Sequence, residues 1–407
     1  RWYPEAARPG ARNRHVAAAT GTVPGRWTRG LSRVVGDFSG AFADLGTFLP
    51  LVLGVLAVNR LNPASVLFGF GCFALATALM YRRPVPVQPM KAVAAIIIAS
   101  GLSAQSVAAA GTTLGVLLIV LALTGAIERL KRAIPQSVLA GVSLGIGLHL
   151  AYAGLQLVSG EWIVGLAIMT LVLALSRTPA SAFACLIGLV LAGAWGAMSA
   201  GNSLAIVPGF YLPEPVLPSW AAFREAGETV VIPQLMLTIA NAVLATAALA
   251  ATYFPGDAER NITPHRLSLS TGALNLALAP LGALPMCHGA GGLVAQHRFG
   301  ARTGLAPAIF GLTCLGLGLF LGNSALAVLA ILPLAAVGAL LVIAGGEMAA
   351  NKRLFDGKPD CLAVILVTGA ACLLVNIAVG VIAGLVAEFI RSRVMRAAYG
   401  DHGQPRS

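Results

Sequence analysis

Three polar side chains interrupt an apolar chain at positions where they could bind an anion. Gln88 and Lys91 lie in the run PVPVQPMKAVA (84–94), and His288 lies in the run ALPMCHGAGGLVAQ (283–296). An amide and an ammonium group donate hydrogen bonds, and a histidine donates or exchanges a proton near neutral pH. The residue types therefore predict a site for a negatively charged ligand.

Both runs carry residues that oppose a helix and then continue into a helical pattern. A proline fixes φ, lacks an N–H group and pushes the preceding residue towards an extended conformation. We expect a short strand followed by a half-helix in each run. The residues concerned are Pro84, Pro86 and Pro89 in the first run, and Pro285, Gly289, Gly291 and Gly292 in the second.

A helix that begins in the middle of a membrane has a specific chemistry at its start. Its first N–H groups have no internal partner, and the positive end of its dipole points at the same place. Lipid cannot satisfy these donors, so such a break is tolerated only where it is buried or lines a cavity. We expect the backbone at Gly289 and Ala290 to join Gln88, Lys91 and His288 in binding an anion.

Polar residues in two further segments are candidates for the same site. Asp44 lies in the middle of an apolar run, where a carboxylate is costly and usually functional, and it is the candidate for proton coupling. Protonation of this acid would favour the loading of an anion beside it. Thr47 follows close to the same helical face, and Asn241 lies in a later apolar run. Both could contact substrate, and the alternative for both is a hydrogen bond between packed helices.

Each of these residues also has a structural interpretation. Lys91 could snorkel or form an ion pair with Asp44, and His288 could be a satisfied core histidine. Glu347 and Glu388 lie near the ends of apolar runs, where we expect solvated pairs with Lys352 and Arg391. A metal site built from Cys287, His288 and His297 is not expected, because helical spacing does not bring the three together.

The composition is that of a polytopic membrane protein. Of the 407 residues, 57% are hydrophobic and 10% are charged, and the mean hydropathy is +0.84. Soluble domains carry roughly 25% charged residues. The six cysteines are widely spaced without a metal-binding pattern, so we expect buried thiols.

Apolar runs predict an all-α fold of fourteen transmembrane segments. Seven are expected before and seven after the Pro- and Glu-containing stretch 200–232. The predicted segments are 36–58, 63–80, 84–100, 113–128, 134–154, 161–175, 179–199, 233–254, 264–281, 283–298, 304–321, 323–345, 361–375 and 377–395.

The basic residues predict the topology. With both termini in the cytoplasm, all of the 27 Lys and Arg residues fall on the cytoplasmic side except Arg60, Arg224 and Lys91. This matches the enrichment of Lys and Arg in cytoplasmic loops. The asymmetry also accounts for the net charge of +12 without a nucleic-acid partner. We expect a multi-pass protein of the inner or plasma membrane.

An odd number of segments in each half places the second half in the opposite orientation. This is the inverted-repeat arrangement of many secondary transporters, and it aligns Pro86 with Pro285. The predicted organisation is a cytoplasmic N-terminal tail (1–33), a first repeat (34–199), an extracytoplasmic connector (200–232), a second repeat (233–396) and a cytoplasmic C-terminal tail (397–407).

Four runs together resemble the molybdate transporters of the sulfate-permease (SulP) superfamily. They are GAFADLGTFLPL (40–51), PVPVQPMKAVAA (84–95), QLMLTIANAVLA (234–245) and LPMCHGAGGLVAQHRFGARTG (284–304). The resemblance implies two inverted repeats divided into a core and a gate domain, with the substrate site between the third and tenth segments and flanked by the first and eighth. It also implies a homodimer. Other SulP proteins end in a cytoplasmic STAS domain, which we do not expect here, as in the molybdate branch.

These observations favour a secondary transporter that imports molybdate, with protons, by elevator-like movement of the core against the gate. Sulfate, bicarbonate and a passive anion channel remain alternatives. Uracil-type permeases share the architecture but bind their substrate through carboxylates near the break, which 84–96 and 283–299 lack. The chain has no HExxH pair, no paired aspartate motif and no GxxxxGKS/T loop, so we expect neither an enzyme nor ATP-driven transport, and no cofactor.

Overall fold

The computed structural model describes residues 26–59, 61–127, 129, 135–178, 181, 183–200, 208–256, 258–350, 359–375 and 377–399. The predicted C-terminal tail and most of the N-terminal tail lie outside these ranges, although α1 begins at Arg26. In the first part of the chain the elements are α1 (Arg26–Ala41), α2 (Leu45–Asn59), α3 (Pro63–Tyr81), β1 (Gln88–Pro89), α4 (Lys91–Ser100), α5 (Ala104–Leu123), α7 (Gln136–Val158), α8 (Trp162–Leu175) and α9 (Ala184–Ala200).

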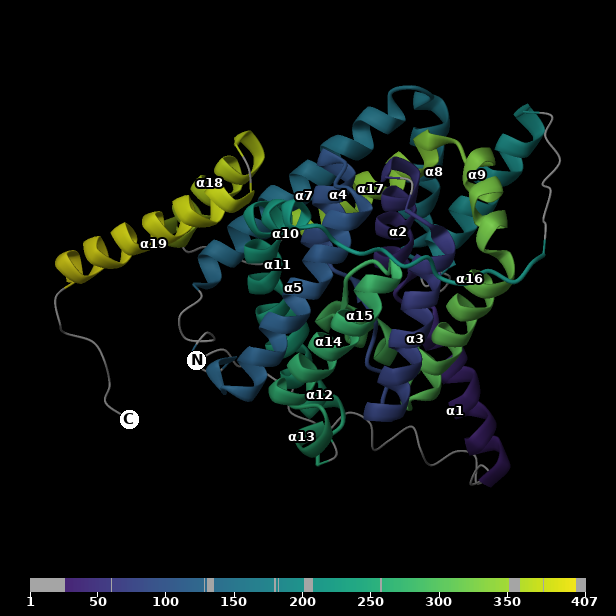
Figure 1. The fold of residues 1–407 in the computed structure, drawn as a ribbon, viewed down its shortest axis with the longest axis horizontal. Coiled ribbons are helices and arrows are strands. Elements are labelled where there is room, and N and C mark those ends of the chain that lie inside the picture. The colour runs from purple at the N-terminus through teal and green to yellow at the C-terminus, as the bar shows by residue number, and fades with distance from the viewer. Residues whose placement is uncertain are drawn as a thin grey trace, which may run out of the picture.

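The second part is also helical (Figure 1). Its elements are α10 (Trp220–Ala226), the π-helix η2 (Gly227–Val231), α11 (Ile232–Leu237), the π-helix η3 (Thr238–Ala245), α12 (Thr246–Tyr253), α13 (Ala258–Asn261), α14 (Pro264–Leu278), the 3₁₀ helix η4 (Ala279–Leu281), β2 (Met286–Cys287), α15 (Ala290–Arg298), α16 (Leu305–Ile331), α17 (Leu334–Ala349), α18 (Pro359–Leu374) and α19 (Ile377–Tyr399).

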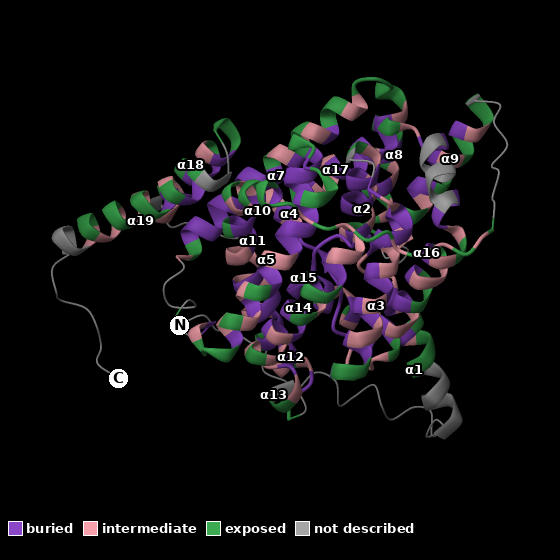
Figure 2. Cartoon of the chain, viewed as in Figure 1, coloured by how far each residue is buried: buried purple, intermediate pink, exposed green. Residues whose placement is uncertain are grey.

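Many of these helices are built to cross a membrane. Within the described residues, six helical runs are long and apolar enough to span a bilayer, and several shorter apolar helices accompany them. Large apolar side chains are exposed on the outer helices, as on α8, α9, α18 and α19 (Figure 2). Such exposure is expected where a helix faces lipid rather than water.

Glycines allow the helices to approach closely. A Cβ atom built on Gly147 of α7 would lie 2.5 Å from the backbone nitrogen of Ala349 in α17. A Cβ atom on Gly154 would lie 2.6 Å from the carbonyl oxygen of Gly338 in the same partner helix. Small residues of this kind let backbones pack directly in membrane helix bundles. They make the α7–α17 pair one of the closest contacts in the fold.

Several predicted boundaries are wrong because local caps and kinks override the hydropathy pattern. The segment expected at 113–128 is α5, which begins at Ala104 because the Ser103 side chain caps it, accepting from the Ser106 N–H at 3.1 Å. The segments expected at 304–321 and 323–345 are α16, which continues past a kink at Leu321 to Ile331, and α17.

The connector is also shorter than the stretch 200–232 suggested. The Ser219 side chain accepts from the Ala222 N–H at 3.3 Å and starts a helical run at Trp220. That run continues through two π-helical turns to Tyr253. A π-helix inserts an extra residue per turn and is frequent at functional sites.

Two short strands cross where the sequence predicts broken segments. β1 pairs antiparallel with β2, with Gln88 opposite Cys287 and Pro89 opposite Met286. The Met90 N–H extends the pairing by donating to the Pro285 carbonyl at 2.9 Å. The strands lie directly before the half-helices α4 and α15, both of which lie near the middle of the molecule (Figure 1).

Asn275 of α14 completes the hydrogen bonding of β2. Its amide oxygen accepts from the Met286 N–H at 2.8 Å, and its amide nitrogen donates to the Met286 carbonyl at 2.6 Å. The same nitrogen donates to the Thr271 carbonyl at 2.7 Å. The side chain is 1% exposed, so water cannot replace it.

Replacing Asn275 with leucine should destabilise the protein. Two buried backbone groups of Met286 would lose their side-chain partner, at roughly 1–3 kcal/mol each. We expect a melting temperature in detergent lower by several degrees, measured by fluorescence-detected size exclusion after heating. Leu276→Ala, a change at a partly exposed neighbour, should shift it much less. Equal shifts for the two variants would show that the amide does not hold β2.

Candidate functional site

A cavity of about 390 Å³ lies beside the starts of the two half-helices. It collects three of the charged groups of the chain together with a hydroxyl and several small residues. The lining residues are Ala43, Asp44, Gly46, Thr47, Leu51, Lys91, Leu150, Gly291, Ala295, Ala344, Glu347 and Met348. The cavity therefore combines residues from the first and second parts of the chain.

Lys91 lines this cavity because α4 begins at this residue. The prolines delay the helix, and Met90 is extended (φ −64°, ψ 112°) immediately before it. Lys91 is then the first helical residue and is half-buried. A positive charge at a helix N-terminus opposes the dipole, so this position favours a nearby anion. No direct ion pair joins Lys91 to an acid within the described part of the chain.

Asp44 enters from the turn between α1 and α2, and Thr47 enters from the first turn of α2. The Asp44 carbonyl accepts from the Thr47 N–H at 3.0 Å, and the Thr47 side chain lies near enough to stabilise the Asp44 carboxylate. The charge of Lys91 acts on Asp44 across the cavity. The structure thus brings together the predicted proton-coupling residue, the predicted hydroxyl donor and the predicted cation.

Gln88 links the carboxylate to the strand pair. Its Nε2 atom donates to Asp44 Oδ2, and the side chain is 1% exposed. Gln88 therefore orients Asp44 and does not itself line the cavity.

The N-terminus of α15 lies against these two side chains. A Cβ atom on Gly289 would collide with the Gln88 amide, and one on Gly292 would lie 2.8 Å from Gln88 Nε2 and also too close to Asp44 Oδ2. On Gly291, by contrast, a Cβ atom would meet nothing within 4 Å. Gly291 accordingly borders the open cavity, whereas Gly289 and Gly292 make room for Gln88 and Asp44.

Replacing Gly292 with alanine should impair transport through this contact. The added methyl group would push Gln88 and Asp44 apart, and a displacement of this size in a binding site costs about 10–100-fold in efficiency. The assay is initial uptake of labelled substrate, normalised to the amount of folded protein.

Gly316→Ala in α16 is the matched control, because a Cβ atom there meets nothing within 4 Å. It should leave uptake unchanged. Full uptake by the Gly292 variant would show that the contact with Asp44 is not needed.

The two half-helices differ in how their first N–H groups are used. Gln234 Oε1 accepts from the N–H groups of Ala92 at 2.8 Å and Val93 at 3.3 Å, which caps α4. Gln234 Nε2 donates to Thr238 Oγ1 at 2.8 Å, which fixes the amide. No side chain caps α15 in the described structure. The expectation of two open helix starts therefore holds for α15 and needs correction for α4.

His288 lies away from the cavity, in contrast to its predicted role as a donor. It is 0% exposed, and its Nδ1 lies 3.0 Å from the Pro86 carbonyl oxygen. Its ring packs edge-on against Phe73 and Tyr81, with centroids 5.6 Å away in both cases. Because Nδ1 lies within hydrogen-bonding distance of the Pro86 carbonyl, His288 holds the first broken segment in place in this conformation.

Asn241, Gly289 and Ala290 do not line the cavity either. Asn241 belongs to η3, and its carbonyl accepts from Thr246 Oγ1 at 3.0 Å. Gly289 and Ala290 are buried at the start of α15. Gly289 packs against the Gln88 amide instead.

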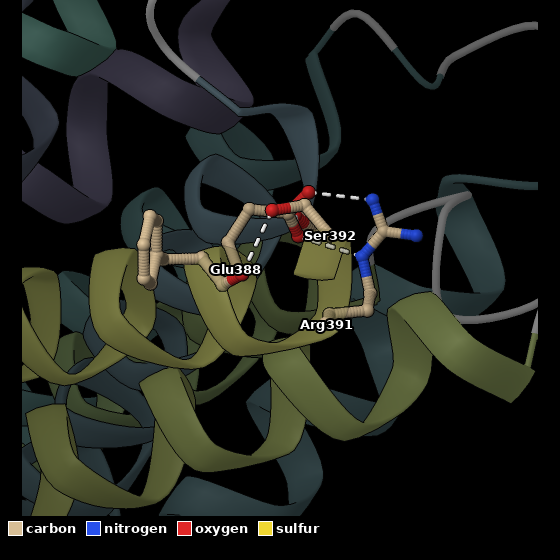
Figure 3. A network of polar contacts seen from close by, with 5 residues as sticks. Glu388, Arg391 and Ser392 are labelled. Carbon is tan, nitrogen blue, oxygen red and sulfur yellow. Dashed lines mark hydrogen bonds and ion pairs between the residues drawn. The ribbon is translucent and has the colours of Figure 1, made fainter. Parts of the chain in front are cut away.

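Glu388 and Glu347, the two acids near the ends of apolar runs, differ in their surroundings. Glu388 of α19 accepts from Arg391 Nη2 at 2.5 Å and Nε at 3.0 Å, which confirms that predicted pair (Figure 3). It also accepts from Ser137 Oγ of α7 at 2.7 Å. Glu347 instead lines the cavity, and its predicted partner Lys352 lies outside the described residues. The helical spacing of Ala344, Glu347 and Met348 was the signal that could have placed it there.

The fold is that of a multi-pass membrane protein. The fold is similar to the transmembrane domain of the cyanobacterial bicarbonate transporter BicA (TM-score 0.63, 17% identity, covering 86% of this chain and 96% of that one). It is also similar to murine Slc26a9, an anion transporter (TM-score 0.65, 14% identity, 90% of this chain and 68% of that one).

The family is identified by sequence. Residues 36–150 and 228–348 match the family described as "Molybdate transporter of MFS superfamily", and the chain belongs to this family. It is 30% identical to Molybdate transporter 2 of Arabidopsis thaliana over 83% of this chain and 84% of that protein. It is 28% identical to Molybdate transporter 1 of Chlamydomonas reinhardtii over 86% of this chain and 90% of that protein. These are transporters and not enzymes.

Proposed function

We propose that the protein is a secondary active transporter that imports molybdate together with protons. The observation that carries the proposal is the cavity in which Lys91, Thr47 and the uncapped start of α15 meet Asp44. Lys91 supplies a positive charge, Thr47 supplies a hydroxyl donor, and α15 supplies backbone donors with the positive end of a dipole. Membership of the molybdate transporter family supports molybdate as the oxyanion.

The charges in the cavity support proton coupling. One lysine faces two carboxylates, Asp44 and Glu347, so the empty cavity is negative when both acids are ionised. A divalent oxyanion enters such a site only at a large electrostatic cost, because charges in a partly buried cavity are weakly screened. Protonation of Asp44 removes one repulsive charge and turns an acceptor into a donor. Substrate and proton would therefore load together.

The arrangement of elements supports two inverted repeats of seven segments. The strand-plus-half-helix units β1–α4 and β2–α15 occupy matching places in the two parts of the chain and pair with each other. Helices α7, α17, α18 and α19 pack mainly with one another, whereas α3 packs on α16 and α5 packs on α14. We assign the first group to a gate domain and the second to a core domain that carries α4 and α15.

Transport would then proceed by movement of the core against the gate. The distribution of the basic residues supports a topology with both termini in the cytoplasm and the protein in the inner or plasma membrane. α17 ends at Ala349, shortly after Glu347, at an end that this topology places on the cytoplasmic side. The cavity would therefore open to the cytoplasm in this conformation.

Sulfate is the main rival substrate. It is also a tetrahedral dianion, and it would use the same donors. The test is uptake of labelled molybdate by proteoliposomes, with and without an inward proton gradient, and with sulfate as competitor. We expect saturable uptake that rises with the gradient and resists excess sulfate. Equal competition by sulfate would refute the choice of substrate, and non-saturable flux without pH dependence would indicate a channel.

A further inference from the structure

The proposal concerns Glu347 of α17. The sequence had suggested that this acid forms a solvated ion pair with Lys352 at the cytoplasmic end of its helix. It lines the same cavity as Lys91, and the charges of the two groups act on each other. No direct ion pair joins them in the described structure, and both border the open space of the cavity. That space is where we place the bound oxyanion.

Glu347 differs from Asp44 in the part of the molecule that carries it. Asp44 is tied through Gln88 to the strand pair, so it keeps its place relative to Lys91 at the start of α4. Glu347 belongs to α17, whose main neighbour is α7, with smaller contacts to α8, α2 and α9. A movement of the half-helices along α7 and α17 would therefore change the distance from Lys91 to Glu347 but not the distance from Lys91 to Asp44.

The surroundings of Glu347 leave its carboxylate available. The residue is exposed, whereas Asp44 and Lys91 are half-buried. Within the described residues, the ionisable groups that act on it are Lys91 from α4, Asp44 from the turn before α2 and the Cys185 thiol from α9. α7 contributes the apolar Leu150 to the cavity lining. Among the described groups around Glu347, Lys91 is thus the cation that can pair with it when the substrate leaves.

We propose that Glu347 is a release residue that competes with the substrate oxyanion for Lys91 when the cavity opens on the side of the α17 C-terminus. This inference rests on the proposed transport of an oxyanion through the cavity. A carboxylate in this place repels the departing dianion and replaces it as the counter-charge of Lys91. It lowers affinity on the inner face only, because the half-helices approach Glu347 only in that conformation.

The test measures substrate affinity separately on the two faces. Proteoliposomes of known orientation are loaded with molybdate, and exchange against labelled molybdate is followed while the inner or outer concentration is varied. In Glu347→Gln, the inner concentration for half-maximal exchange should fall about 3- to 10-fold, with the outer value unchanged. Glu347→Asp should resemble the wild type, and Glu347→Ala should repeat the shift and serves if the glutamine variant folds poorly.

Glu228→Gln is the control, since Glu228 is an exposed acid 3.6 Å from Arg224 and outside the cavity. It should alter neither constant. An unchanged inner constant in both neutral Glu347 variants, or equal shifts on the two faces, would overturn the release role. Absence of molybdate exchange in the wild type would instead refute the proposed function itself, so the two failures are distinguishable.

Discussion

Replacing Asp44 with asparagine should abolish molybdate uptake driven by a proton gradient and leave molybdate exchange largely intact. Asparagine has the shape of a protonated aspartate, and its amide oxygen can still accept from Gln88 Nε2, the donor to Asp44. The site would bind the oxyanion without taking up a proton. In proteoliposomes we expect gradient-driven accumulation to fall to the level without a gradient.

The pH dependence of uptake gives a second readout for the same variant. Wild-type uptake should decrease as the external pH rises, because the ionised Asp44 repels the dianion, whereas the Asp44→Asn variant should show a flat profile. Glu228→Gln, outside the cavity, should keep the wild-type profile. A variant that still accumulates molybdate against its gradient would show that Asp44 is not the coupling group.

Replacing Lys91 with glutamine should remove most of the binding of molybdate. A hydrogen bond to a charged group contributes roughly 1.5–3 kcal/mol, which corresponds to a loss of about 10–150-fold in affinity. Lys91 is the only cation among the residues that line the described cavity, so no other side chain there can substitute for it. The measurement is the rise in melting temperature on adding molybdate, which should be clear in the wild type and absent in the variant.

Lys91→Arg and Gln88→Glu separate charge from geometry around this position. Arginine keeps the charge and should retain part of the affinity, although its planar group differs in shape from an ammonium group. Glutamate at position 88 would place an unpaired acceptor against Asp44 Oδ2 and should impair binding even with Lys91 present. Undiminished stabilisation of Lys91→Gln by molybdate would place the anion elsewhere.

The sequence was most informative where a local rule determines the structure. Prolines predicted that α4 starts near Met90, which puts Lys91 at the first helical position. In the second run the prediction was wrong for Gly291 and Gly292, which were expected to oppose the helix but lie inside α15, because a glycine costs a helix far less than a proline does. A carboxylate in the middle of an apolar run pointed to Asp44, which lies in the cavity with Thr47; its role in proton coupling stays a prediction. Each of these predictions depends on residues close together in the chain.

The sequence was least informative where distant residues meet. Gln234 caps a helix that starts more than a hundred residues earlier, and no local pattern specifies which amide reaches which helix start. His288 was predicted to donate to the substrate, but the orientation of its ring depends on packing against Phe73 and Tyr81. Glu347 looked like a solvated end residue because hydropathy does not show which face of α17 borders a cavity.

The central claim is that the cavity beside Lys91 is the molybdate site. The position of the molybdenum atom of the bound substrate tests this claim most directly. Molybdenum scatters anomalously, so crystals grown with molybdate can locate it without assuming a binding mode. We expect one anomalous peak between Lys91, Thr47 and the start of α15, lost in Lys91→Gln crystals. A peak outside this cavity, for example in the smaller cavity of about 140 Å³ near Ser65 and Glu214, would contradict the account.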